Sequence, residues 1–194
     1  MKKYALIMID MQRGFIDARS PLCIPMAAAT VNACGEALRV CREAGQSVVF
    51  AVRHYKADGS DVEKCRRDVW LKGGKPLSEE CEDYMSDAFP EEFERAEGDY
   101  CILKPRFSAF FATNLDLLLR RLGVDTVILA GTTTPNCVRT TCYDALSLDY
   151  DVIVLSDCTS SVTEAVQQAN LGDMARIGAR ILTLAELKTE LGNE

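Results

Sequence analysis

The stretch from Thr126 to Asp157, TVILAGTTTPNCVRTTCYDALSLDYDVIVLSD, predicts a strand, a helix and a second strand in succession. Strand-like segments with apolar centres lie at 126–131 and 151–157, and a helical pattern at 136–149 separates them. Strands that are apolar throughout are buried on both faces, and a helix joining two of them is typical of a parallel sheet. This stretch therefore predicts an α/β fold with helices on both faces of the sheet.

The same alternation extends over the rest of the chain. Further strands are predicted at 4–9, 47–52 and 100–103, and a last strand and short helix at 180–191. Further helices are predicted at 30–45, 113–123 and 163–178, with Thr113 and Thr163 as N-caps and Gly123 as a C-terminal stop. The polar stretch 54–99 is expected to be an excursion of short helices and loops. All 194 residues are expected to form a single domain.

Composition narrows the class of protein. Hydrophobic residues make up 48% and charged residues 26%, as in globular proteins, and the net charge is −7. No basic run is present, which argues against a nucleic-acid partner. No apolar stretch approaches the roughly 20 residues of a membrane helix. The opening MKKYALIMID has too short an apolar run for a signal peptide, so we expect a cytoplasmic protein.

The cysteines and the single histidine exclude several kinds of site. Nine cysteines are scattered without any C-x-x-C, which argues against a disulfide framework, a zinc ribbon or a thioredoxin-type centre. One histidine, His54, nearly excludes His-rich metal sites and Ser-His-Asp or Cys-His triads. A nucleophile in this chain must therefore be activated by another group, unless His54 itself is the base.

Residues with ionisable or nucleophilic side chains follow three of the predicted strands. Asp10 follows the first strand, Lys104 follows the strand 100–103, and Cys137 follows the turn Gly131–Thr134. Taken singly, each fits an ordinary structural role: a turn cap, a surface lysine and a core cysteine. Ligands in open parallel sheets bind at the carboxyl ends of the strands, so we expect these three residues at one rim.

Together the three residues supply the groups that nucleophilic catalysis by a thiol requires. A thiol needs a base for its proton, a cation to hold the thiolate and donors for the oxyanion that follows. Asp10 is suited to be the base and Lys104 the cation. A helix beginning at Cys137 favours ionisation of its thiol, and backbone N–H groups of the turn supply donors. Glycine at 131 allows a sharp turn at the strand end.

The motifs at these strand ends resemble those of a known family. They read IDMQRGF (9–15), KPRFSAFFATNLDLLLR (104–120) and GTTTPNCV (131–138), in this order. The combination resembles the cysteine hydrolases of the isochorismatase-like superfamily, which includes nicotinamidases and N-carbamoylsarcosine, ureidoacrylate and biuret hydrolases. The resemblance covers nearly the whole chain, from residue 4 to about 184.

The resemblance implies a fold and a catalytic machinery. The fold is a three-layer α/β/α, Rossmann-like arrangement around a mainly parallel six-stranded sheet. The catalytic triad is Asp10, Lys104 and Cys137. A cis peptide bond is implied between Thr132 and Thr133, and the N–H groups of Thr133 and Cys137 are implied as the oxyanion hole.

The chain departs from metal-dependent nicotinamidases. Their metal site includes an Asp-x-His after the second core strand, where this chain has VRHYKADGSD, so His54 and Lys56 take the two positions. No second histidine exists to rebuild the site, and we expect no metal and no other cofactor. His54 is interpreted as a partly buried loop residue, with a pocket wall as the alternative.

Arginines and aromatic residues near the strand ends are candidates for substrate binding. Arg53 and Arg106 adjoin predicted strand ends, and their forked donors suit a carboxylate or a ureide. Arg66 and Arg67 are interpreted instead as a solvated face. The candidate apolar walls, with core packing as an equal alternative, are Phe15, Tyr55, Trp70 and Phe107. Gln12 resembles a family position that supports the catalytic aspartate.

We therefore expect a cysteine-dependent hydrolase of a small amide or ureide C–N bond, acting through a thioester and releasing ammonia or an amine. The alternatives are a vinyl-ether hydrolase of the isochorismatase type and a non-catalytic binding protein on the same scaffold. A redox-sensing role for Cys137 is a further alternative. The resemblance also implies a homo-oligomer, either a dimer or a tetramer.

Overall fold

Six strands form one sheet in the computed structural model, which describes residues 2–192. Their spatial order is β3-β2-β1-β4-β5-β6, and every neighbouring pair is parallel. The strands are β1 (Tyr4–Ile9), β2 (Ser47–Val52), β3 (Tyr100–Leu103), β4 (Thr126–Thr132), β5 (Asp151–Ser160) and β6 (Arg180–Leu182). The predicted six-stranded parallel sheet in a single α/β domain is confirmed.

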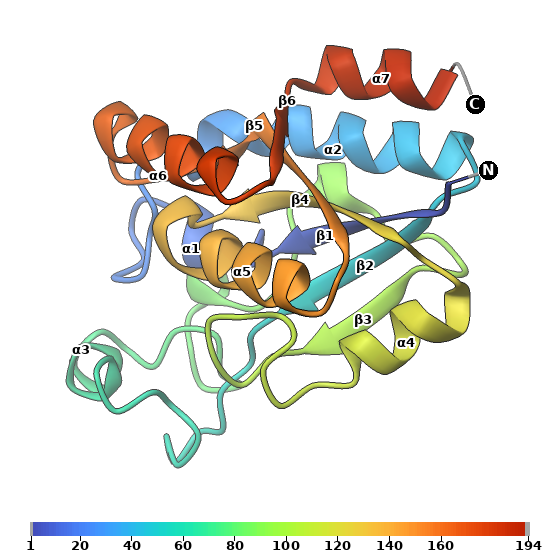
Figure 1. Cartoon of the computed structure of the whole chain (residues 1–194). Helices are drawn as coiled ribbons and strands as arrows, with labels where there is room; N and C mark the ends of the chain where they lie inside the picture. Colours follow the sequence, from blue (N-terminus) through green and yellow to red (C-terminus); the bar gives the residue numbers. More distant parts are fainter. Residues whose placement is uncertain (1, 193–194) are drawn as a thin grey trace.

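Helices cover both faces of the sheet, as the strand pattern predicted (Figure 1). One face carries α2 (Ala27–Glu43) and α7 (Leu184–Gly192), and the other carries α4 (Leu115–Leu122), α5 (Arg139–Ser147) and α6 (Glu164–Arg176). Side chains alternate between the faces of a strand. The buried β1 accordingly sends Ala5, Ile7 and Ile9 into one core cluster and Tyr4, Leu6 and Met8 into the other. None of the helices within residues 2–192 has the length and hydropathy of a bilayer-spanning segment.

Two predicted helix caps are confirmed. The Thr163 side chain accepts a hydrogen bond from the Val166 N–H at 3.3 Å, and α6 begins at the next residue. Gly123 ends α4 in the left-handed conformation, with φ of 70°. The N-cap of α4 is Asn114 rather than the predicted Thr113, whose hydroxyl still accepts from the first N–H of the helix.

The stretch 54–99 forms short elements, α3 (Arg67–Lys72), η1 (Asp83–Met85) and η2 (Glu91–Phe93), as expected. Together with α1 (Arg13–Ile16), it encloses a small apolar cluster of its own. Trp70 lies in this cluster with no exposed surface, and its Nε1 donates to the carbonyl of Pro76 at 2.7 Å. Trp70 therefore packs in the core, which was the alternative to its predicted place in the wall of the substrate pocket.

The strand order places a crevice between β1 and β4. The chain winds outward from β1 toward β3 on one side and continues from β4 toward β6 on the other. In open parallel sheets, ligands bind where the winding direction reverses, outside the carboxyl ends of the strands. Asp10 follows β1 and the Thr132–Cys137 segment follows β4, so both adjoin this crevice.

Gly131 allows β4 to approach β1 closely at this point. It pairs with Ile9, has φ of +107°, and a Cβ added to it would lie 2.1 Å from the Ile9 carbonyl oxygen. We expect Gly131→Ala to lower the free energy of unfolding by about 3 kcal/mol, since both strain and a clash with buried backbone result.

Urea denaturation with Gly172→Ala as the control measures this cost. Gly172 lies in α6, where an added Cβ meets nothing within 4 Å, so alanine there is expected to be neutral or slightly stabilising. Equal stabilities of the two variants would contradict the close approach of β1 and β4.

Candidate active site

Three strand ends bring Asp10, Lys104 and Cys137 together. Lys104 follows β3, and its Nζ lies 2.8 Å from Oδ2 of Asp10, with both side chains almost fully buried. Asp10 has φ of +52°, a left-handed conformation that aspartate tolerates better than most residues and that is frequent at functional sites. Burial of a carboxylate is costly unless a cation pairs with it, and Lys104 provides that pairing here.

The turn after β4 presents Cys137 to the Asp10–Lys104 pair. The chain passes through a cis peptide bond between Thr132 and Thr133 and then a π-helical turn, η3 (Thr134–Val138), before α5. The hydroxyls of Thr133 and Thr134 both donate to the Ser160 carbonyl, at 3.2 and 3.0 Å. Cys137 thus lies in a turn anchored to β5, and not in a regular helix from residue 136 as predicted.

Arg53 is a second buried cation beside the thiol. Its Nη2 lies 4.0 Å from Sγ of Cys137, and its Nε lies 3.8 Å from Oδ2 of Asp10. Its Nη1 pairs with Glu63 and donates to the hydroxyl of Tyr55 at 3.0 Å. The side chain has no exposed surface. Arg53 was predicted to bind substrate, but it is absent from the cavity lining and is buried against Glu63, Asp10 and Cys137 instead.

The surroundings of Cys137 favour the protonated thiol over the thiolate. Burial raises the pKa of Cys137 above its usual value, and the positive charges of Lys104 and Arg53 oppose that rise without cancelling it. The negative charge of Asp10 acts in the same direction as burial. Deprotonation of this thiol therefore needs a nearby proton acceptor, and the Asp10 carboxylate lines the same cavity.

This protonation state predicts how alkylation of Cys137 depends on pH. The thiolate is the reactive form, so iodoacetamide is expected to label Cys137 slowly at neutral pH. Labelling should accelerate only above the ordinary thiol pKa of 9.0. Peptide mass spectrometry across a pH series measures the rate, with the exposed Cys65 as the internal reference. Fast labelling at neutral pH would instead indicate a thiolate already held by the two cations.

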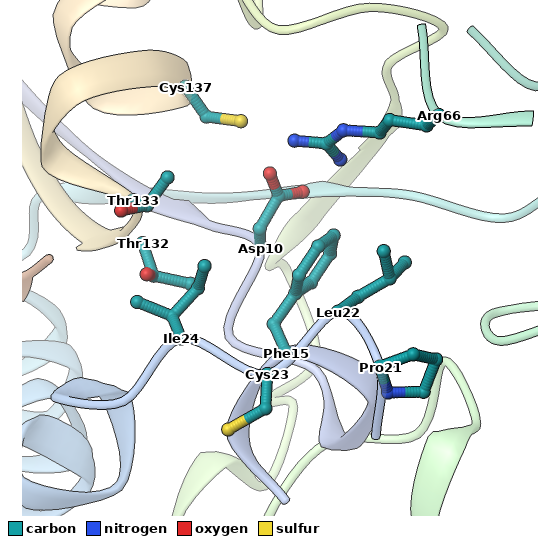
Figure 2. Close-up of a pocket in the computed structure, with 10 residues that line it drawn as sticks. All are labelled: Asp10, Phe15, Pro21, Leu22, Cys23, Ile24, Arg66, Thr132, Thr133 and Cys137. Atoms are coloured by element: carbon teal, nitrogen blue, oxygen red, sulfur yellow. The ribbon is translucent and has the colours of Figure 1, made fainter. Parts of the chain in front are cut away.

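A cavity of about 210 Å³ opens onto these groups (Figure 2). Its polar lining comprises Asp10, Thr132, Thr133, Cys137 and Arg66. Its apolar lining comprises Phe15 and residues 21–24 of the loop that follows α1, including Pro21, Leu22 and Ile24. The volume lies below the usual range of ligand pockets, about 300–1,000 Å³, and fits a small substrate.

Comparison with known proteins agrees with this arrangement. A family model described as the isochorismatase domain matches residues 4–186. This chain belongs to the isochorismatase family. A crystal structure of an isochorismatase family protein from Desulfovibrio vulgaris superposes with a TM-score of 0.91 at 38% identity, covering 99% of this chain and 100% of that one.

Two relatives of this isochorismatase-family chain carry more specific names. A protein of Arabidopsis thaliana named "Probable inactive nicotinamidase" is 36% identical, over 96% of this chain and 95% of its own. The maleamate amidohydrolase of Pseudomonas putida is 33% identical, over 89% of this chain and 79% of its own. The expectation that the chain is a hydrolase acting on C–N bonds agrees with the name of the second relative, whereas the first is named as inactive.

The remaining residues predicted to bind substrate in this isochorismatase-family protein differ in their position relative to the cavity. Phe15 lines the cavity, as predicted. Phe107 lies between two arginines, 5.4 Å from Cζ of Arg53 and 5.0 Å from Cζ of Arg66. Arg106 is exposed and donates to the carbonyls of Asp61 and Pro105, so the structure does not place it in the cavity.

Gln12 and Tyr55 support Arg53. Gln12 is buried, donates to the Arg53 carbonyl at 2.7 Å and accepts from the Arg53 N–H at 2.8 Å. It therefore ties the ends of β1 and β2 together. Tyr55 is buried and donates to Glu63 at 2.7 Å, rather than lining the cavity.

Sequence reasoning missed two parts of the cavity. Arg66, interpreted as part of a solvated face, is one of the lining residues. Residues 21–24 were not considered, although the apolar letters of PLCI between polar neighbours were a weak signal. Both lie in loops, whose course the periodicity of a sequence does not predict.

The metal site of nicotinamidases does not fit the residues present. His54 is half-buried, and its Nδ1 lies 2.8 Å from Oδ2 of Asp87, outside the cavity lining. Within residues 2–192, no group of at least three His, Cys, Asp or Glu side chains is placed to hold a metal ion. We derive no catalytic step through a metal.

Proposed function

We propose that this protein hydrolyses the C–N bond of a small amide or ureide, with Cys137 as the nucleophile and a thioester as the intermediate. The observation that carries the proposal is the 2.8 Å ion pair of Asp10 with the buried Lys104, since Asp10 lines the same cavity as Cys137. Base, cation and nucleophile are the groups that such a reaction requires.

In the first half of the reaction, the sulfur of Cys137 attacks the carbonyl carbon while Asp10 takes the thiol proton. The carbonyl electron pair moves to oxygen, and the N–H groups of Thr133 and Cys137 stabilise the oxyanion. The intermediate then collapses, the C–N bond breaks, and Asp10 gives its proton to the departing nitrogen. Ammonia or an amine leaves, and the acyl group remains on the sulfur.

In the second half, Asp10 takes a proton from a water molecule as the water oxygen attacks the thioester. The C–S bond breaks, the thiolate receives the proton, and the acid product leaves. Lys104, 2.8 Å from the Asp10 carboxylate, holds it in place and pairs with its negative charge whenever the proton has been passed on. Arg53, 4.0 Å from the sulfur, stabilises negative charge on it during attack and departure.

Ammonia release from a substrate panel tests the proposal. The panel contains nicotinamide, maleamate, ureidoacrylate, biuret and N-carbamoyl amino acids. Release from at least one member supports an amidohydrolase. If the folded protein releases no ammonia but forms pyruvate from isochorismate, the function is vinyl-ether hydrolysis instead. If the folded protein forms neither ammonia nor pyruvate, a binding protein on the same scaffold is favoured.

The expected homo-oligomer, the cytoplasmic location and the absence of a nucleic-acid partner remain predictions. Light scattering coupled to size-exclusion chromatography measures the first of these. A mass of about 21.4 kDa, that of one chain, would contradict the dimer or tetramer.

A further inference from the structure

Arg66 is one of the polar residues that line the cavity. Figure 2 shows its guanidinium group directed toward the sulfur of Cys137 and the carboxylate of Asp10. It precedes α3 and belongs to the excursion 54–99, so it reaches the cavity from a different part of the chain than the catalytic groups do. A substrate bound to Cys137 therefore lies within the reach of this side chain.

Arg66 differs from the other cations of the site in having no acidic partner. Lys104 is paired with Asp10, and Arg53 is paired with Glu63. Among the described residues, no carboxylate forms an ion pair with Arg66, and its Nη1 is buried without a hydrogen-bond partner. A buried donor on a charged group is costly when unsatisfied, so a ligand acceptor at this position is favourable.

The guanidinium group is already held in place. Its Cζ lies 5.0 Å from the centre of the Phe107 ring, so the guanidinium group packs on an aromatic face. A side chain that is oriented before binding loses less conformational entropy when the ligand arrives. Its planar fork matches the two oxygens of a carboxylate.

We infer that the substrate carries a carboxylate, which Arg66 binds while the amide carbonyl faces Cys137. The class is a small amide or ureide of an acid, such as the half-amide of a short dicarboxylic acid. This inference rests on the proposed function and specifies its substrate. Arg53 and Arg106 were the predicted candidates for this role, but Arg53 is paired with Glu63 and Arg106 donates to backbone carbonyls outside the cavity lining.

Half-amides and diamides of the same dicarboxylic acids test the inference. Malonamate, succinamate and glutaramate differ from malonamide, succinamide and glutaramide only in replacing a neutral amide with a carboxylate. The wild-type protein is expected to prefer the half-amide by about 10- to 100-fold in kcat/KM, since hydrogen bonds to charged groups have that effect. Arg66→Gln should remove most of this preference, and Arg66→Lys should restore part of it.

Arg67→Gln is the matched control, because Arg67 is adjacent and exposed and does not line the cavity. It should keep the wild-type preference. Equal kcat/KM values for half-amide and diamide in the wild type, or a preference that survives in Arg66→Gln, would overturn the inference and leave the proposed hydrolase standing.

A binding measurement separates failure of the inference from failure of the proposed function. Succinate cannot be hydrolysed, and calorimetry measures its binding to Cys137→Ala with or without Arg66→Gln. Binding that is weakened at least 10-fold by Arg66→Gln supports the carboxylate site even if no amide in the panel is hydrolysed. Binding that does not change overturns it.

Discussion

Replacing Cys137 with alanine is expected to lower kcat for the best amide substrate on the order of 10⁴-fold or more. Without the sulfur no thioester forms, and the remaining groups can only assist direct attack by water. The buried side chain loses one atom, so the fold should remain intact. Steady-state ammonia release measures the loss, and near-ultraviolet circular dichroism checks the fold.

Two other cysteines are matched controls for this variant. Cys23 lines the same cavity but directs its sulfur away from Asp10 and Arg66 (Figure 2), and Cys142 is buried in α5 outside the cavity lining. Alanine at either position should keep hydrolysis within about tenfold of the wild type. Full activity of Cys137→Ala would eliminate the nucleophile role.

Replacing Lys104 with methionine is expected to reduce both activity and stability. The variant removes the closest cation from the buried Asp10 carboxylate and leaves Arg53, 3.8 Å away, as its remaining ion-pair partner among the described residues. This should lower the free energy of unfolding by about 3 kcal/mol. Loss of the lysine charge also raises the pKa of Cys137 further, since that charge acts to lower it. We expect kcat to fall by about 10²- to 10³-fold.

The double variant Asp10→Asn with Lys104→Met separates the two effects. Removing both charges leaves no unpaired carboxylate, so stability should return toward that of the wild type while activity stays lost. Urea denaturation and ammonia release measure the two quantities. A Lys104→Met variant as stable and active as the wild type would show that the ion pair is not needed.

The sheet was predictable from the sequence because its signal is local. Short, continuously apolar runs such as those of β1 and β4 are typical of strands buried on both faces, and a threonine at a helix start, as at Thr163, has a clear capping role. The extension of β5 to Ser160 was missed, since its pairing shifts register beside Gly131 and continues to Thr132. That irregularity depends on the neighbouring strand, and not on the residues of β5 alone.

The residues at the strand ends were predictable for a topological reason. Parallel strands place Asp10, Lys104 and Cys137 at one rim whatever lies between them in the chain. The roles of the arginines were not predictable in the same way. Which of Arg53 and Arg66 lacks an acidic partner depends on where the excursion 54–99 places Glu63. No periodic pattern in the sequence specifies the position of Glu63.

Mass spectrometry of the enzyme quenched during turnover tests covalent catalysis by Cys137 most directly. We predict a transient mass increase equal to the acyl group of the substrate, located on the peptide that contains Cys137 and accompanied by an initial burst of ammonia. The adduct should be absent from Cys137→Ala. Efficient hydrolysis without any adduct or burst, under conditions that accumulate a thioester from a slow acyl substrate, would contradict the nucleophilic role of Cys137.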